Sequence, residues 1–289
     1  MKIIDFKTPA RLEDAGRTLK ELGEAGLLLA GGTSLVFNKG KAGRTAVDIR
    51  RLGLSGIKEL PEAFLVGALT PVAELQEFRA KGWALDRVAR AFATQQIRNM
   101  STFGGNLARV FRWNDFPVAL LALECEMTVR TLTGQDRPVR GSEFLAASPR
   151  RFLPDGDILT AVKVGRLASG WGFGYRKEVR THADFSLATA AVAARVVSGR
   201  IVELRAAAGA ALPFPKRLEK VESLLVGKAV PRKGLDEDAF LAEAREGCAG
   251  LPWKGECGFS DAYAAALAPV AVRDAVAAAV RDAQEGNHG

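Results

Sequence analysis

The pattern of apolar and polar residues along this chain predicts a mixture of helices and strands. Residues 11–25 place apolar side chains, from Leu12 to Leu22, at helical spacing. The apolar run at 27–30 comes directly after them and is typical of a short buried strand. Because this helix and strand lead into a turn with two glycines, we interpret residues 1–55 as a small α/β lobe.

Residues 56–169 show a different pattern, which predicts a second lobe that mixes strands with short helices. Strands are expected at 64–67, 126–131, 137–140 and 157–164, and helices at 71–80, 83–93 and 116–124. A Thr-Gly-Gln turn separates the two central strands, which are therefore interpreted as a hairpin. Thr70 and Pro71 supply a cap and a first-turn proline for the helix after them.

The residue pattern changes after residue 169, and we place the domain boundary there, giving domains 1–169 and 170–289. Residues 173–177 are interpreted as an edge strand. The alanine-rich run 183–197 and the segment 201–208 form either a hairpin-like pair or a helix followed by a strand, and both alternatives remain open. Helices are expected further on, at about 215–227, 236–247 and 261–284.

The composition is that of an ordinary globular protein and narrows the class of partner. The 289 residues carry a formal net charge of +8, which would suit an acidic ligand or partner. The basic residues are scattered and only 7% of residues are aromatic, so we expect no nucleic-acid binding. The N-terminus lacks an apolar signal segment, and no run approaches ~18 consecutive apolar residues. We therefore expect no membrane span.

The cysteines and histidines argue against a metal centre in this chain. Cys125, Cys248 and Cys257 form no CxxC pair and no ligand-spaced set, so the chain by itself cannot hold a four-cysteine iron–sulfur cluster. His182 and His288 are the only histidines, and we expect no metal site and nominate no catalytic acid or base. Sparse cysteines without a disulfide framework indicate a cytoplasmic protein.

Two turns in the first domain combine paired glycines with hydroxyl and amide side chains. The first is Ala-Gly-Gly-Thr-Ser-Leu at 30–35, and the second is Thr-Phe-Gly-Gly-Asn at 102–106. Paired glycines let backbone N–H groups approach a bound oxygen, and two such turns would suit a long ligand with a diphosphate. Neither is the GxGxxG fingerprint, because the third glycine and a subsequent long helix are missing. A Gly-Gly pair alone usually marks an ordinary tight turn.

Taken in order, these motifs resemble those of a known family over nearly the whole chain. The specific ones are AGGTSL at 30–35, QIRNMSTFGGN at 96–106 with Asp115 after it, and the spaced Lys177, Arg180 and Asp184. The runs LPDGDILTAV at 153–162 and PFPKRLEKVESLLVG at 213–227 agree. The chain resembles the FAD-binding (medium) subunit of the molybdenum hydroxylases, the xanthine dehydrogenase and carbon monoxide dehydrogenase group.

The resemblance implies an α+β fold and FAD as the cofactor. The fold would be a two-lobed FAD-binding domain of the PCMH/vanillyl-alcohol-oxidase type, with lobes of about 1–55 and 56–169. A smaller α/β C-terminal domain of the carbon monoxide dehydrogenase flavoprotein type would come after it. The implied cofactor-binding residues are Leu28, Leu29, Ala30, Gly31, Gly32, Thr33, Ser34, Leu35, Phe92, Thr102, Gly104, Gly105, Asn106, Asp115, Leu159 and Lys177.

Several of these residues have a structural alternative. Asp115 matches a family carboxylate that would accept hydrogen bonds from ribityl or ribose hydroxyls, and it is equally a possible N-cap of the helix 116–124. Phe92 and Leu159 either line the flavin ring or belong to the core. Lys177 matches a lysine near the flavin ring, where a cation raises the flavin potential. Arg176 would take that part if the register slipped by one residue.

The implied function is electron transfer within a heterotrimer. FAD would carry electrons from iron–sulfur centres of a small subunit, reduced by a large subunit with the molybdenum cofactor, to NAD, a quinone or another carrier. The chain departs from the family at Arg109, Arg112 and Trp113, which could form an acceptor site, a subunit contact or plain surface. Alternatives are a self-sufficient FAD-dependent oxidase or reductase and a binding protein that has lost FAD.

Overall fold

The computed structural model describes residues 2–37, 42–109, 111–154, 156–230, 238–255 and 258–286. Cys257 and His288 lie outside this part of the chain. The fold is 36% helical and 28% strand, which confirms the expected mixed class. By contacts, the first compact unit is Met1–Leu75, Thr94–Arg109 and Cys125–Val164, and the second is Gln76–Ala93, Val110–Glu124 and Gly165–Gly289.

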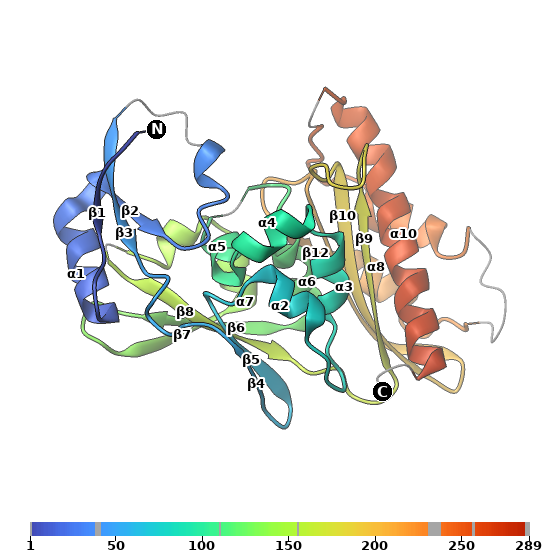
Figure 1. Ribbon diagram of the computed structural model, residues 1–289. Coiled ribbons are helices and arrows are strands. Elements are labelled where there is room, and N and C mark those ends of the chain that lie inside the picture. Colours follow the sequence, from blue (N-terminus) through green and yellow to red (C-terminus); the bar gives the residue numbers. More distant parts are fainter. Residues whose placement is uncertain are drawn as a thin grey trace. The chain divides into compact units, whose positions relative to one another are not determined.

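The N-terminal part of the first unit is a parallel three-stranded sheet covered by one helix (Figure 1). Its strand order is β1 (Lys2–Lys7), β3 (Gly43–Asp48) and β2 (Gly26–Leu29), and the helix is α1 (Leu12–Leu22). The apolar face of α1 buries Ala15 in a core with Val47. The predicted helix and strand before the first glycine turn are therefore confirmed.

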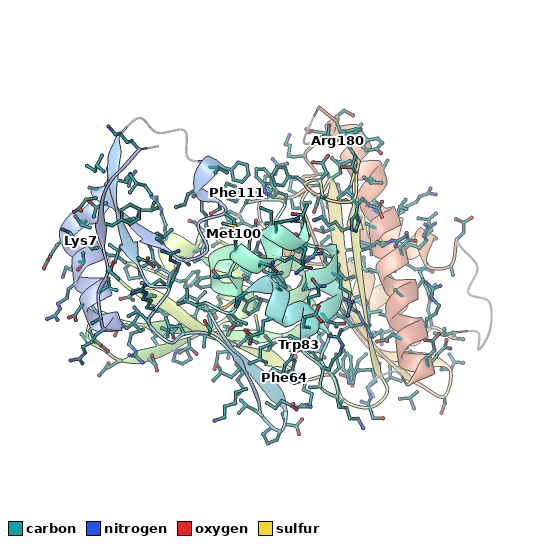
Figure 2. The ribbon with its side chains drawn as sticks, in the orientation of Figure 1. Lys7, Phe64, Trp83, Met100, Phe111 and Arg180 are labelled. Carbon is teal, nitrogen blue, oxygen red and sulfur yellow. The ribbon has the colours of Figure 1, made fainter. Side chains whose placement is uncertain are left out.

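The same unit contains a second, five-stranded sheet. Its order is β4 (Ile57–Glu59), β5 (Ala63–Gly67), β8 (Ile158–Gly165), β6 (Cys125–Arg130) and β7 (Asp136–Arg140). β6 and β7 pair antiparallel as the predicted hairpin. The short helices around this sheet are α2 (Val72–Glu77), α4 (Gln95–Met100), α5 (Phe103–Ala108) and α7 (Gly141–Leu145). Phe64 on β5, labelled in Figure 2, is 1% exposed and anchors the sheet in its core.

The second unit is built on an antiparallel four-stranded sheet. Its order is β12 (Lys216–Arg217), β11 (Arg200–Gly209), β10 (Ala188–Val197) and β9 (Trp171–Glu178). Of the two alternatives for residues 183–208, the hairpin is confirmed, because the alanine-rich run forms strand β10, which pairs antiparallel with β11. β9 lies at the edge of the sheet, as predicted for 173–177.

Helices cover both faces of this sheet. α10 (Asp261–Glu285) packs on β9 and β10 (Figure 1), while α6 (Phe116–Leu123) packs on β10 and β11. A Cβ on Gly209 would come within 2.4 Å of Val118 of α6, and it would point to the side of the sheet opposite to α10. The two helices therefore cover opposite faces of the sheet. The remaining helices of the unit are α3 (Leu85–Ala91), α8 (Glu219–Leu225) and α9 (Leu241–Cys248).

α10 lies unusually close to β9. A Cβ on Gly172 would come within 2.0 Å of the Ala279 carbonyl oxygen, and one on Gly174 within 2.0 Å of that of Ala275. By length and composition α10 could cross a membrane, but 56% of its most apolar window is buried inside the protein. Burial against a sheet is the pattern of a core helix.

Candidate cofactor site

The first glycine turn leaves the C-terminal end of strand β2. Gly32 adopts a positive φ of 72°, which favours glycine. The Leu35 N–H donates to the Gly32 carbonyl at 3.0 Å, and the Phe37 N–H donates to that of Ser34 at 3.3 Å. These bonds fold the chain into a compact turn that continues as the short 3-10 helix η2 (Leu35–Phe37).

The backbone donors of this turn are open. Within the described residues, the N–H groups of residues 31–34 have no hydrogen-bond acceptor. Residues 31–35 are half-buried, so these donors are neither deep in the core nor spread over an exposed loop. Consecutive N–H groups of this kind form an anion-binding concavity. The turn therefore has the donor set that a phosphate oxygen requires.

The second glycine turn is the start of helix α5, and its donors are used inside the protein. The Phe103 N–H donates to the Thr70 carbonyl at 2.9 Å, and the Gly104 N–H donates to that of Ala68 at 2.8 Å. Thr102 is the N-cap residue and receives the other two donors. Its Oγ1 accepts the Gly105 N–H at 3.2 Å, and its carbonyl accepts the Asn106 N–H at 3.1 Å.

The structure brings the two predicted turns together. Thr33 Oγ1 and Ser101 Oγ lie 2.9 Å apart, which joins the first turn to the residue before Thr102. A Cβ on Gly31 would come within 2.1 Å of the carbonyl oxygen of Met100, the residue labelled at the end of α4 in Figure 2. Only glycine permits this approach. The two turns thus lie against each other, and the second turn supports the first through these contacts.

The apolar residues predicted in this unit occupy different positions. Leu159 is 4% exposed on β8, opposite Val129 of β6, in a typical core environment. Leu28 and Leu29 belong to strand β2, and together with Ala30 and Leu35 they are half-buried. Their contact with a cofactor stays a prediction.

Three further predicted residues, Phe92, Asp115 and Lys177, lie near one another in the second unit. The Lys177 Nζ lies 3.2 Å from Asp115 Oδ1 and 3.3 Å from Oδ2, and it donates to the Ala91 carbonyl at 3.2 Å. The ring of Phe92, next to Ala91, lies 5.8 Å from the ring of Phe116, next to Asp115. Both charged side chains are buried, at 8% exposure for Lys177 and 5% for Asp115.

The register of β9 distinguishes Lys177 from Arg176. Successive side chains of a strand point to opposite faces, so only one of the two can point toward Asp115. Arg176 has a 55% exposed side chain, whose Nε lies 3.3 Å from Asp274 Oδ2 of α10. Lys177 is therefore the buried cation on the α6 side of the sheet.

Asp115 does not act as a helix cap. It occupies the N-cap position of α6 with helical backbone angles, and its side chain accepts no capping hydrogen bond. Its Oδ1 accepts instead from the Tyr175 hydroxyl at 2.6 Å. Burial raises the pKa of the Asp115 carboxyl, while Lys177 and the Tyr175 hydroxyl act in the opposite direction. Burial, and then the Asp115 charge, raise the pKa of the Tyr175 hydroxyl well above its usual value.

Tyr175 is a site residue that the sequence motifs did not single out. It lies two residues before Lys177 on β9, so the two side chains share a face of the sheet. That alternation was the available signal, because a tyrosine beside a buried lysine and aspartate requires a partner for its hydroxyl.

Residues 111–113, which come after the second glycine turn and depart from the family pattern, pack within the second unit. The rings of Phe111 and Trp113 stack 5.0 Å apart at 7°, and Trp113 lies 4.8 Å from the ring of Phe185. Arg112 donates to the Lys254 carbonyl at 3.1 Å. His182 is exposed, and the part of the chain with a described structure contains no group of metal-ligating side chains.

Comparisons with known proteins match both halves of the chain. Residues 2–166 match the family described as the FAD binding domain in molybdopterin dehydrogenase, and residues 173–279 match the CO dehydrogenase flavoprotein C-terminal domain. The medium chain of carbon monoxide dehydrogenase from Afipia carboxidovorans is 30% identical over 83% of this chain and 85% of its own. The medium subunit of nicotine 6-hydroxylase from Paenarthrobacter nicotinovorans is 28% identical over 78% and 80%.

A solved structure agrees with the sequence matches. The carbon monoxide dehydrogenase from Hydrogenophaga pseudoflava that lacks the Mo-pyranopterin moiety of its cofactor contains a chain with a TM-score of 0.86 and 27% identity. The match covers 97% of this chain and 98% of that one. The resemblance read from the two glycine turns and the motifs after them is confirmed, and this chain belongs to the FAD-binding medium subunits of the molybdenum hydroxylase family.

Proposed function

We propose that this protein carries electrons between the iron–sulfur centres of a partner subunit and an external carrier, using FAD. The carrier would be NAD, a quinone or another acceptor. FAD supplies the redox chemistry, because it accepts electrons singly and donates them singly or in pairs. The residues of this chain bind the cofactor, exclude water from it and set the charge around it.

The observation that carries the proposal is the set of open donors in the first turn. The N–H groups of residues 31–34 have no acceptor among the described residues, whereas those of 103–106 are used inside the protein. We therefore assign the FAD diphosphate mainly to the first turn. The second turn supports it through the Thr33–Ser101 hydrogen bond and the close approach of Gly31 to Met100.

The proposed cofactor-binding residues are those implied by the family motifs. They are Leu28, Leu29, Ala30, Gly31, Gly32, Thr33, Ser34, Leu35, Phe92, Thr102, Gly104, Gly105, Asn106, Asp115, Leu159 and Lys177. The open donors of the first turn and the buried ion pair of Asp115 and Lys177 support this assignment. We propose the boundary between the two sequence domains near residue 169, and the ends of the two family matches, at residues 166 and 173, support it.

The proposed partners are an iron–sulfur small subunit and a large subunit with the molybdenum cofactor, in a cytoplasmic heterotrimer. Relatives named medium chain or medium subunit support this, since those names imply larger assemblies. Cys125, Cys248 and Cys257 form no cluster-binding set in the sequence, so iron–sulfur centres would have to come from another chain.

A matched pair of serine variants tests the diphosphate site. Ser34 lies in the first turn, and Ser55 is an exposed serine of the same unit. A carboxylate at position 34 would repel a diphosphate, so Ser34→Asp is expected to weaken FAD binding at least ~10-fold, whereas Ser55→Asp leaves it unchanged. Titration of the FAD-free chain with FAD, monitored by flavin fluorescence, measures both. Equal affinities in the two variants would contradict the assignment.

Purification from the native host tests the electron-transfer role. Co-elution with an iron–sulfur and a molybdenum subunit, and reduction of the flavin when the substrate of the complex is added, are the expected results. A yellow protein that elutes alone and turns over a substrate by itself would favour a self-sufficient oxidase or reductase. A chain that binds no FAD under any condition would favour a binding protein.

A further inference from the structure

Two side chains of strand β9 contact the buried carboxylate of Asp115. The Tyr175 hydroxyl donates to Oδ1 at 2.6 Å, and the Lys177 Nζ lies 3.2 Å from Oδ1 and 3.3 Å from Oδ2. The tyrosine bond is the shortest of these contacts. Lys177 also donates to the Ala91 carbonyl at 3.2 Å, so its position does not depend on Asp115 alone. The hydroxyl of Tyr175 has no such second partner among the described residues.

The charge on Asp115 results from opposing effects. Only 3% of the residue is exposed, and burial favours the neutral carboxylic acid. The Lys177 charge and the hydrogen bonds from Tyr175 and Lys177 favour the carboxylate, with a smaller contribution from Ser186. Nearby, Arg180 Nε lies 2.8 Å from Asp184 Oδ2, and the hydrogen bond from Arg180, together with the charges of Arg180 and Lys177, lowers the pKa of the Asp184 carboxyl. Since burial raises the pKa of Asp115 and the donors oppose that shift, the loss of one donor raises the pKa further.

We propose that Tyr175 is a positioning residue whose hydroxyl fixes the Asp115 carboxylate as the ionised partner of Lys177. This inference rests on the proposed function for its consequence, because Asp115 and Lys177 are cofactor residues only under that proposal. With Asp115 ionised, the pair is neutral overall. With Asp115 protonated, the pair carries the positive charge of Lys177, and a cation near FAD stabilises its reduced, more negative form. Tyr175 then keeps the flavin potential from rising.

Removal of the hydroxyl alone separates this role from packing. Tyr175→Phe keeps the ring, and the matched control is Tyr263→Phe, which alters the only other tyrosine of the chain. Tyr263 lies in α10, is 44% exposed and stacks on Phe259 at 4.8 Å. Thermal unfolding of each FAD-free variant checks that both remain folded.

Infrared spectroscopy of the full chain without FAD reports the protonation of Asp115. The carboxylic-acid C=O band that disappears in Asp115→Asn belongs to this residue, and its growth on acidification gives the midpoint. Loss of a hydrogen bond to a charged acceptor is expected to raise the midpoint by about one to two pH units in Tyr175→Phe. Tyr263→Phe leaves it unchanged. An unchanged midpoint in Tyr175→Phe overturns the inference.

The midpoint potential of the FAD-loaded protein distinguishes the inference from the proposed function. We expect a more positive potential in Asp115→Asn, and the same direction in Tyr175→Phe at pH values between the two carboxyl midpoints. If Asp115→Asn changes the potential and Tyr175→Phe changes neither potential nor carboxyl midpoint, the inference fails and the cofactor assignment stands. If the carboxyl midpoint moves and Asp115→Asn leaves the potential unchanged, the cofactor assignment of Asp115 fails and its positioning by Tyr175 stands.

Discussion

The turn at 30–35 and the turn at 102–106 both combine two glycines with a hydroxyl residue, but they use their backbone in different ways. In the first, the N–H groups of 31–34 have no acceptor among the described residues. In the second, the corresponding groups donate to Ala68, Thr70 and Thr102. Two turns of similar composition thus differ in their free donors, and we propose that the first binds the ligand and the second supports it.

The difference comes from the secondary structure on the C-terminal side of each pair of glycines and from acceptors distant in sequence. After Gly104 and Gly105 the chain continues as helix α5, capped by Thr102. The donors of this turn therefore form hydrogen bonds with Thr102 and with the carbonyls of Ala68 and Thr70. After Gly31 and Gly32 the chain enters a short 3-10 turn, whose hydrogen bonds among the described residues use the donors of Leu35 and Phe37 and not those of residues 31–34. An anion site therefore requires donors that local structure leaves over, and glycine content alone does not supply them.

The largest effect is expected from Gly31→Ala. The new Cβ would lie within 2.1 Å of the Met100 carbonyl oxygen, and because both groups are backbone, one segment must move. We expect a loss of about 3 kcal/mol in the free energy of unfolding, with loss of FAD. Gly53→Ala is the control, since Gly53 has a φ of 70° but no atom within 4 Å of its new Cβ, and its cost is about 1 kcal/mol. Urea unfolding measures both, and equal losses would contradict the close approach.

Hydrogen exchange tests the contrast between the turns directly. Without FAD, the amides of residues 31–34 are expected to exchange fast and those of 103–106 slowly. With free FAD at ~100 times its dissociation constant, the first set gains protection of about 100-fold, because exchange then requires dissociation of the ligand. The second set changes much less. Equal gains in both turns would show that the second turn also binds the diphosphate through its donors.

The smallest effect is expected from the helix cap. Thr102→Ala removes the acceptor of the Gly105 N–H, which is 3.2 Å from Oγ1, and should destabilise the chain by about 1 kcal/mol. Thr102→Ser keeps the acceptor and should retain most of the stability. FAD affinity, measured where all variants are folded, should fall far less in Thr102→Ala than in Ser34→Asp. A fall as large as that of Ser34→Asp would move the diphosphate toward the second turn.

The fold was largely predictable where one face of an element is buried and the other exposed. Helix α1 was found because its apolar residues repeat at helical spacing. Helix α4 was missed because none of its residues is buried, and its apolar Ile97 and Met100 are 38% and 58% exposed. Strand β10 stayed ambiguous because helices cover both of its faces, which removes the alternation of polar and apolar residues that identifies a strand.

The site was predictable only in part. The first turn could be found from its glycines, but which of the two turns keeps open donors depends on partners such as Ala68 and Thr70, distant in sequence. The ion pair of Asp115 and Lys177 joins residues 62 positions apart. No local sequence pattern connects these two residues, so only the family resemblance predicts that both lie near a cofactor. Tyr175 carried a local signal, the alternation of strand β9, that could have been used.

The close contact between β9 and α10 means that an insertion or deletion in one element affects its fit to the other. Gly172 faces the carbonyl of Ala279 and Gly174 faces that of Ala275, so two glycines spaced by two match two alanines spaced by four. An insertion or deletion of one residue in either element would replace both fits at once with side-chain collisions. The register of the strand and that of the helix can therefore change only together.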